Sequence, residues 1–138
     1  MPDKHMRDYS LRRLEKSSDD LDTAQLNYDA GKHNASANRA YYAVYHAIRS
    51  VLALDDIERK KHSGNIGYFR EHYIATNIFD KTYSETIKNA EILRNEADYD
   101  DMKNITAEDA QDVIDKARRF YNAVKEYIEK RLNDGEAV

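Results

Sequence analysis

The sequence contains no cysteine, a single proline at position 2 and only four glycines in 138 residues. Without cysteine, the protein has no disulfide bond, no thiolate ligand for a metal and no cysteine nucleophile. The scarcity of proline and glycine leaves few positions after Pro2 at which an α-helix must end. These absences favour an all-α protein before any periodicity is considered.

Long apolar segments are also absent. No stretch approaches the ~18 apolar residues that a membrane-spanning helix needs, and residues 1–10 lack the apolar core of a secretory signal. We therefore expect a cytoplasmic protein with no membrane association. The net charge is −4 and the isoelectric point is near 5.7, so any contact with RNA requires a local basic patch or one assembled by an oligomer.

Apolar residues recur with helical spacing along most of the chain, which predicts four long helices. They are expected over residues 6–30, 34–54 and 81–97, and from the N-cap Thr106 to about residue 132. Leu11, Leu14 and Leu21 are expected to face the core from the first helix. The second helix is rich in alanine and has a wide apolar surface, which predicts a central position and a close neighbour.

The other segments are expected to be connections and one short helix. Gly31 is expected to end the first helix in a left-handed conformation. A short helix after Ser63 would turn Ile66, Phe69 and Tyr73 inward. Polar connections are expected at residues 55–61 and 98–104, and a frayed tail at 133–138.

No internal repeat, low-complexity segment or domain linker is present. The chain is therefore expected to form one domain over residues 1–138, with a core from about residue 6 to 132. Short connections make consecutive helices antiparallel neighbours. The predicted fold is all-α: an up-down four-helix bundle with one extra short helix.

Three sequence blocks resemble those of HEPN domains. The first is SANRAYYA at residues 36–43, the second is KHSG at 61–64 with FREH at 69–72, and the third is RNEADY at 94–99. The third block resembles the branch of the family whose motif ends in Ala-Asp-Tyr. The order of the blocks and the helix lengths also fit, so the resemblance covers nearly the whole chain. It implies a four- or five-helix bundle that pairs into a homodimer.

The resemblance also implies a range of functions. Members of the family include metal-independent ribonucleases, toxins of toxin–antitoxin pairs and partners of small nucleotidyltransferases. The ribonuclease branch carries an arginine, four to six further residues and then a histidine. Arg94 and Asn95 match the start of that pattern, but Tyr99 stands where the histidine is expected. Arg94 and Tyr99 are thus the catalytic candidates, and whether the protein is an enzyme stays open.

The exchange of histidine for tyrosine changes what this motif can do. Metal-free cleavage of RNA uses the 2′-hydroxyl as nucleophile and needs a base, an acid and a cation for the phosphorane. A histidine with a pKa near ~6.5 can move these protons, whereas a tyrosine near ~10 is a poor base at neutral pH. Arg94 can still hold a phosphate bidentately, and Tyr99 can bind a phosphate or stack on a base. Binding is therefore better supported than cleavage.

Five residues are candidates for substrate binding: Asn95, Asp98, Asn38, Arg39 and His62. His62 opens a glycine-containing loop and is the best candidate to replace the missing motif histidine. Asn38 and Arg39 lie on the less apolar side of the second helix, as part of a polar wall that faces Arg94. The alternative is structural: Arg94 offsets the helix dipole and pairs with Asp98 four residues later.

Two other groups of residues have competing interpretations. Tyr42 and Tyr45 share one helical strip with Asn38 and Arg49, yet core or dimer contacts with satisfied hydroxyls are favoured for both tyrosines. The positive run at residues 59–62 can touch phosphate, but a solvated loop is the simpler interpretation.

The histidines lack the spacing of a zinc motif, so we expect no metal site and no cofactor. One hypothesis is a homodimeric toxin–antitoxin or defence component that binds RNA or a nucleotide through Arg94 of both subunits, with metal-independent endoribonuclease ancestry. The second is a non-catalytic dimeric module that docks on a small nucleotidyltransferase. The third is a helical scaffold in which Arg94 is structural.

Overall fold

A computed structural model describes residues 2–136, and this part of the chain is helical without any strand. The helices are α1 (Lys4–Asp29), α2 (His33–Leu54), α3 (His62–Phe69), α4 (Thr82–Tyr99) and α5 (Ala107–Glu136). A short π-helical segment, η1 (Arg70–Ile74), continues α3. The all-α prediction with one extra short helix is confirmed.

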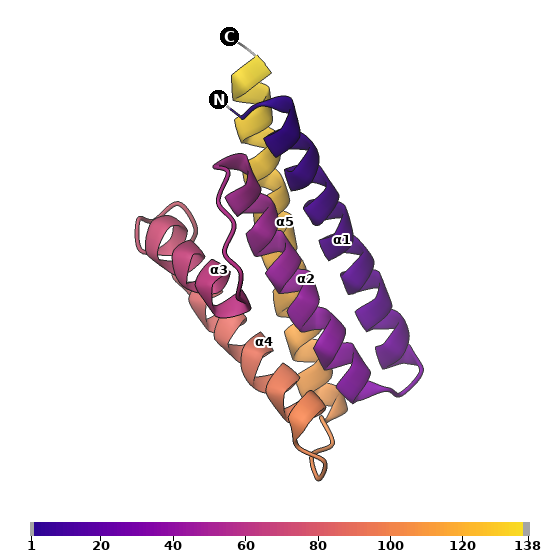
Figure 1. Ribbon diagram of the computed structural model, residues 1–138. Helices are drawn as coiled ribbons and strands as arrows, with labels where there is room; N and C mark the ends of the chain where they lie inside the picture. Colours follow the sequence, from indigo (N-terminus) through magenta and orange to yellow (C-terminus); the bar gives the residue numbers. More distant parts are fainter. Residues whose placement is uncertain (1, 137–138) are drawn as a thin grey trace.

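The long helices run up and down, and the described ends of the chain lie together at one end of the bundle (Figure 1). Helix α2 packs against α1, α3, α4 and α5, which confirms its predicted central position. The short helix α3 lies beside α2 in the connection that leads to α4 (Figure 1). The C-terminal half of α4 is thereby placed against the N-terminal half of α2, which brings the HEPN-like blocks together.

Small residues let α1 and α2 approach closely. Ser17 Oγ donates to the carbonyl of Ala43 at 2.6 Å, and Ser10 Oγ donates to that of Ser50 at 2.7 Å. Both serines are fully buried, and Leu14, Leu21 and Ala24 of the same helix are buried as well. Leu11, in contrast, is 39% exposed. The predicted inward position of Leu11 is therefore wrong, because buried polar serines occupy the stripe that only apolar residues were expected to fill.

The predicted helix ends are mostly confirmed. Gly31 has a φ of +78° and its N–H donates to the carbonyl of Tyr28 at 2.9 Å. Thr106 Oγ1 accepts from the N–H of Asp109 at 3.1 Å at the start of α5. Ile66, Phe69 and Tyr73 are buried, as expected for the inner side of the short helix.

Two helix ends lie later than predicted. Helix α4 continues through Tyr99, because Asp98 is paired with Arg94 one turn earlier. Helix α5 continues to Glu136, and Arg131 near its end donates to Asp55 at 3.0 Å. The helix thus ends later than the predicted end near residue 132, fraying of the tail stays a prediction, and residues 137–138 lie outside the described residues.

The core is filled by large side chains from every helix. Phe69, Phe79 and Phe120 meet at ring-centroid distances of 5.3 to 6.3 Å, and Phe120 is fully buried. None of the helices within residues 2–136 combines the length and the apolar character needed to cross a bilayer.

Candidate functional site

Arg94 lies near the C-terminal end of α4 and is fixed by residues of two helices. Its Nε donates to Asp98 Oδ2 at 3.0 Å, and one terminal nitrogen donates to Tyr42 Oη at 3.3 Å. The guanidinium carbon is 5.0 Å from the centre of the Tyr41 ring and 5.5 Å from that of Tyr99. Its orientation is therefore set by hydrogen bonds and by aromatic faces, and one-fifth of the side chain stays exposed.

A chain of hydrogen bonds leads from Asp98 across α2 to α1. Asn38 Nδ2 donates to both carboxylate oxygens of Asp98, at 2.9 and 3.1 Å, and Asn38 Oδ1 accepts from Arg39 at 2.8 and 3.0 Å. Arg39 also donates to Asp20 Oδ1 at 3.2 Å, and Asp20 Oδ2 is 2.7 Å from His46 Nδ1. The predicted polar wall on α2 is a continuous network that includes α1.

His62 joins the same site from α3. Its Nδ1 is 3.0 Å from Tyr41 Oη, and its ring stacks on Tyr45 with 3.9 Å between centroids. It is the first residue of α3 rather than part of a glycine-containing loop as expected. The helix begins earlier than the predicted start after Ser63. The contacts with Tyr41 and Tyr45 hold the His62 ring against α2.

The surroundings of His62 disfavour its protonation. Partial burial lowers the pKa of His62, and the positive charges of Arg94 and Arg49 lower it further. Burial also raises the pKa of Tyr41 to about 12, so the phenol keeps its proton. In the tautomer with the proton on Nδ1, His62 donates to Tyr41 Oη, and its Nε2 is left as a proton acceptor.

The tyrosines of the strip have different roles. Tyr45 is 5% exposed, and its hydroxyl accepts from Asn65 Nδ2 at 2.9 Å. This environment matches the favoured interpretation as a core residue with a satisfied hydroxyl. Tyr42 is only half-buried and lies between two guanidinium groups, with Arg39 4.7 Å and Arg94 5.6 Å from its ring. Tyr42 therefore borders the polar wall, while its ring also packs against the core and its hydroxyl accepts from Arg94. A dimer contact of Tyr42 stays a prediction.

The remaining motif residues lie outside the network. Asn95 is exposed, and its side chain makes no hydrogen bond to any residue of the described chain. Tyr99 is 71% exposed and contacts Arg94 only with its ring. The structure thus gathers Arg94, Asp98, Asn38, Arg39 and His62, while Asn95 and the hydroxyl of Tyr99 face solvent.

Sequence reasoning missed Asp20 as a member of this site. Its side chain is 13% exposed and binds both Arg39 and His46. Asp20 belongs to a polar run of α1, and no local spacing connects it with residues of α2. The one sequence feature that pointed to a partly buried Asp20 was its position next to Leu21, a residue expected to face the core. No group of three or more His, Asp or Glu side chains within residues 2–136 is arranged to hold a metal ion.

Comparisons with known proteins agree on the family. A HEPN domain model matches residues 10–127. Two proteins of Methanocaldococcus jannaschii that are each named "Putative toxin" are 32% and 26% identical to this chain. The alignments cover 89% of this chain and 84% of the first protein, and 94% of this chain and 96% of the second. A UPF0332 protein of Thermotoga maritima is 27% identical over 79% of this chain and 83% of its own length.

A solved structure shows the same fold. The crystal structure of an archaeal HEPN homologue superposes with a TM-score of 0.59 at 19% identity, and covers 91% of this chain and 99% of that chain. The region matched by the family model contains the arginine motif on α4 and the polar wall on α2. The sequence match, the bundle and the gathering of these blocks lead to one conclusion: this chain belongs to the HEPN family.

Proposed function

We propose that this protein is a HEPN toxin-like component that binds the phosphate of RNA or of a nucleotide through Arg94. The observation that supports this most directly is the fixed guanidinium between Asp98 and Tyr42, next to the polar wall of α2. Two relatives whose names contain the word toxin support the biological setting.

Arg94 keeps hydrogen-bonding capacity for a ligand. Its Nε is used by Asp98 and one terminal nitrogen by Tyr42, whereas the other terminal nitrogen has no partner in the described chain. A guanidinium whose plane is already fixed loses less entropy when it binds a phosphate than a free side chain does. Tyr42 can add its hydroxyl as a second donor to the same phosphate.

The site also supports metal-independent cleavage of RNA. Tyr99 is a poor base, but His62 Nε2 is a neutral proton acceptor beside Arg94 in the tautomer described above. His62 would take the proton of a 2′-hydroxyl while O2′ bonds to phosphorus and the bond from phosphorus to O5′ breaks. The leaving oxygen would take its proton from water or from a second group of the site, and Arg94 would stabilise the phosphorane charge.

A homodimer would complete this site. Large apolar side chains are exposed on and directly after α4, where Ile92 is 46%, Tyr99 71% and Met102 91% exposed. Burial of such residues against a second copy would place two Arg94 side chains near one another. Two arginines would hold a phosphate more strongly than one arginine on a protein with a net charge of −4.

The proposed function is tested with Arg94→Ala. We expect binding of a fluorescent RNA oligonucleotide to weaken by about tenfold to a hundredfold, since a charge-assisted hydrogen bond contributes about 1.5–3 kcal/mol. Arg118→Ala, a change of an exposed arginine on α5, is the matched control and should bind like wild type. Cleavage is measured in EDTA. A variant that binds as well as wild type but melts earlier would support the scaffold hypothesis.

The second candidate function is a non-catalytic module that partners a nucleotidyltransferase. The exposed hydroxyl of Tyr99, which has no partner in the described chain, supports this alternative because a transferase could reach it. Mass spectrometry of the protein co-expressed with a neighbouring nucleotidyltransferase would show a nucleotide adduct on Tyr99, and Tyr99→Phe would abolish it. An unmodified Tyr99 without co-purification would argue against this role.

A further inference from the structure

We propose that Arg59 and Lys60 form a second phosphate subsite beside the Arg94 site, so that the ligand is a single-stranded polynucleotide rather than a mononucleotide. This inference rests on the proposed function, because it extends the same binding site. Its basis is a groove, its charge and the way in which its loop is held.

The groove has a volume of about 480 Å³ and lies between the C-terminal half of α2 and the start of α3. Arg49, Arg59 and Lys60 supply its cations, and His62 and Tyr45 supply aromatic rings. The groove therefore shares His62 with the Arg94 site. A strand that leaves Arg94 past His62 would reach these cations directly.

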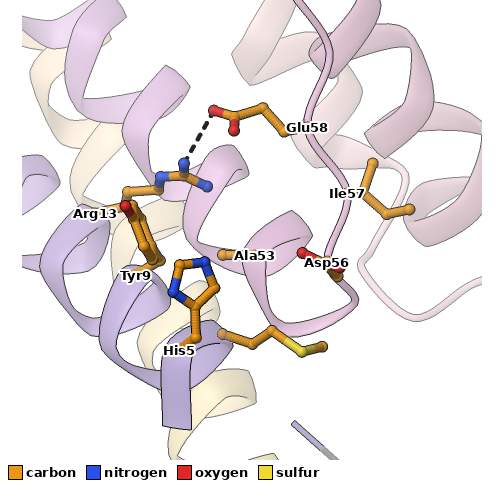
Figure 2. A pocket seen from close by; sticks show the side chains of 8 residues that line it. His5, Tyr9, Arg13, Ala53, Asp56, Ile57 and Glu58 are labelled. Carbon is orange, nitrogen blue, oxygen red and sulfur yellow. Dashed lines mark hydrogen bonds and ion pairs between the residues drawn. The ribbon is translucent and has the colours of Figure 1, made fainter. Parts of the chain in front are cut away.

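The charge of the groove is positive although the chain as a whole is acidic. Its one lining carboxylate, Glu58, accepts from Arg49 at 2.6 Å and from Arg13 at 3.0 Å. Figure 2 shows the second contact, in which Glu58 from the segment after α2 faces Arg13 on α1. Arg59 and Lys60 form no ion pair with any carboxylate of residues 2–136. Their charges are thus available to an anion.

The loop backbone is fixed while its charged side chains are exposed. Asn65 is 2% exposed, and its Oδ1 accepts from the N–H of Arg59 at 2.9 Å. Its Nδ2 donates to the carbonyl of Arg59 at 3.2 Å and to Tyr45 Oη at 2.9 Å. A Cβ added at Gly64 would lie 3.0 Å from the Cβ of Arg59, so the loop packs closely on α3.

This construction favours a polynucleotide over other anions. Proteins that bind single strands combine a positive groove for the backbone with aromatic rings for the bases. Here the rings open to a base are the partly exposed His62, which stacks on the buried Tyr45 at 3.9 Å, and Tyr68, which lies 5.1 Å from the Arg59 guanidinium. The buried Asn65 fixes the loop backbone, so the charged side chains project from a defined position.

The experiment compares ligands of different length. Binding of uridine monophosphate and of a fluorescent uridine oligonucleotide of about eight residues is measured for the full chain. The variant is Arg59→Ala with Lys60→Ala, which leaves the backbone contacts of Asn65 in place. The control is Arg118→Ala with Arg119→Ala, which removes another adjacent pair of exposed cations.

We expect the Arg59 and Lys60 variant to bind the oligonucleotide about tenfold more weakly and the monophosphate within about twofold of wild type. The slope of log K against log salt should fall by about 1.4, since each lost phosphate contact on a single strand contributes about 0.7. The control should change neither value. Equal oligonucleotide binding by the variant and wild type would overturn the subsite. An equal loss of oligonucleotide binding in the control would also overturn the subsite, because the binding would then depend on nonspecific attraction to any pair of exposed cations.

The failure of this inference differs from the failure of the proposed function. If wild type binds the monophosphate as tightly as the oligonucleotide, and Arg94→Ala abolishes both, the Arg94 site stands and the subsite is wrong. If wild type binds neither ligand, both proposals fail. If a Gly64→Ala variant shifts the loop, its oligonucleotide affinity should fall while its monophosphate affinity is retained.

Discussion

Replacement of Asn65 by alanine tests the loop attachment quantitatively. Asn65 makes hydrogen bonds to Tyr45 Oη and to the N–H and carbonyl of Arg59. A typical hydrogen bond contributes about 1 kcal/mol net, so the three together would give about 3 kcal/mol. Water can replace the lost partner at the exposed Arg59 but not at the buried Tyr45. We therefore expect Asn65→Ala to lower the free energy of unfolding by about 2–3 kcal/mol.

The measurement is urea unfolding followed by circular dichroism, at one protein concentration because a dimer would make stability concentration-dependent. The melting temperature should fall by roughly 8–12 °C, at about 4 °C per kcal/mol for a chain of this size. Tyr45→Phe removes only one of the hydrogen bonds and should cost about 1 kcal/mol. It serves as the matched control.

A double-mutant cycle decides whether the contacts act together. The cost of the Asn65→Ala and Tyr45→Phe double variant should be smaller than the sum of the single costs by about 1 kcal/mol, because both remove the same hydrogen bond. Strictly additive costs, or a loss below about 1 kcal/mol in Asn65→Ala, would refute the reasoning that Asn65 holds the loop.

Further predictions concern the core, the helix contact and the pH dependence. Phe120→Ala should cost about 3–5 kcal/mol in urea unfolding because the ring is fully buried; a cost near that of a surface change would be inconsistent with the packing. Ser17→Val should destabilise more than Ser17→Ala, since it adds volume where α1 and α2 touch; equal costs would contradict that close contact. The pKa of His62 is held below its ordinary value of 6.5, so the unfolded chain takes up the proton first. The contribution of the neutral His62 side chain to the free energy of unfolding is therefore full above about pH 6.5. This contribution is lost as the pH falls through the lower pKa of His62 in the folded state. His62→Gln should flatten the stability profile between about pH 7 and 5, and an unchanged slope would count against this environment.

The helices could be predicted from the sequence because each long helix carries a local signal. Ala37, Ala40 and Val44 repeat on one face of α2, and the central position of that helix followed from the breadth of its apolar surface. Leu11 was misplaced because periodicity alone assigns every apolar residue to the core. The stripe of α1 was completed by Ser10 and Ser17, whose hydroxyls bind carbonyls of another helix. Such contacts leave no periodic signal in the sequence.

The site could be predicted only in part for a similar reason. Arg94 and Asp98 are four residues apart, so their pairing could be inferred from helix geometry alone. The contact of Asp20 with Arg39 and His46 depends on how α1 and α2 pack, and no spacing within one helix encodes it. The approach of His62 to Tyr41 depends on where α3 docks.

The manner in which Asn65 holds the loop has an evolutionary consequence. Its hydrogen bonds reach the backbone of Arg59, whose side chain also packs near Tyr68, and they leave the side chains of Lys60 and Lys61 without a hydrogen bond or ion pair within residues 2–136. Substitutions there change the charge offered to a ligand while the bundle keeps its stability. Ligand preference can thus drift by single mutations at these positions, and selection on stability falls on Asn65 and Tyr45 instead.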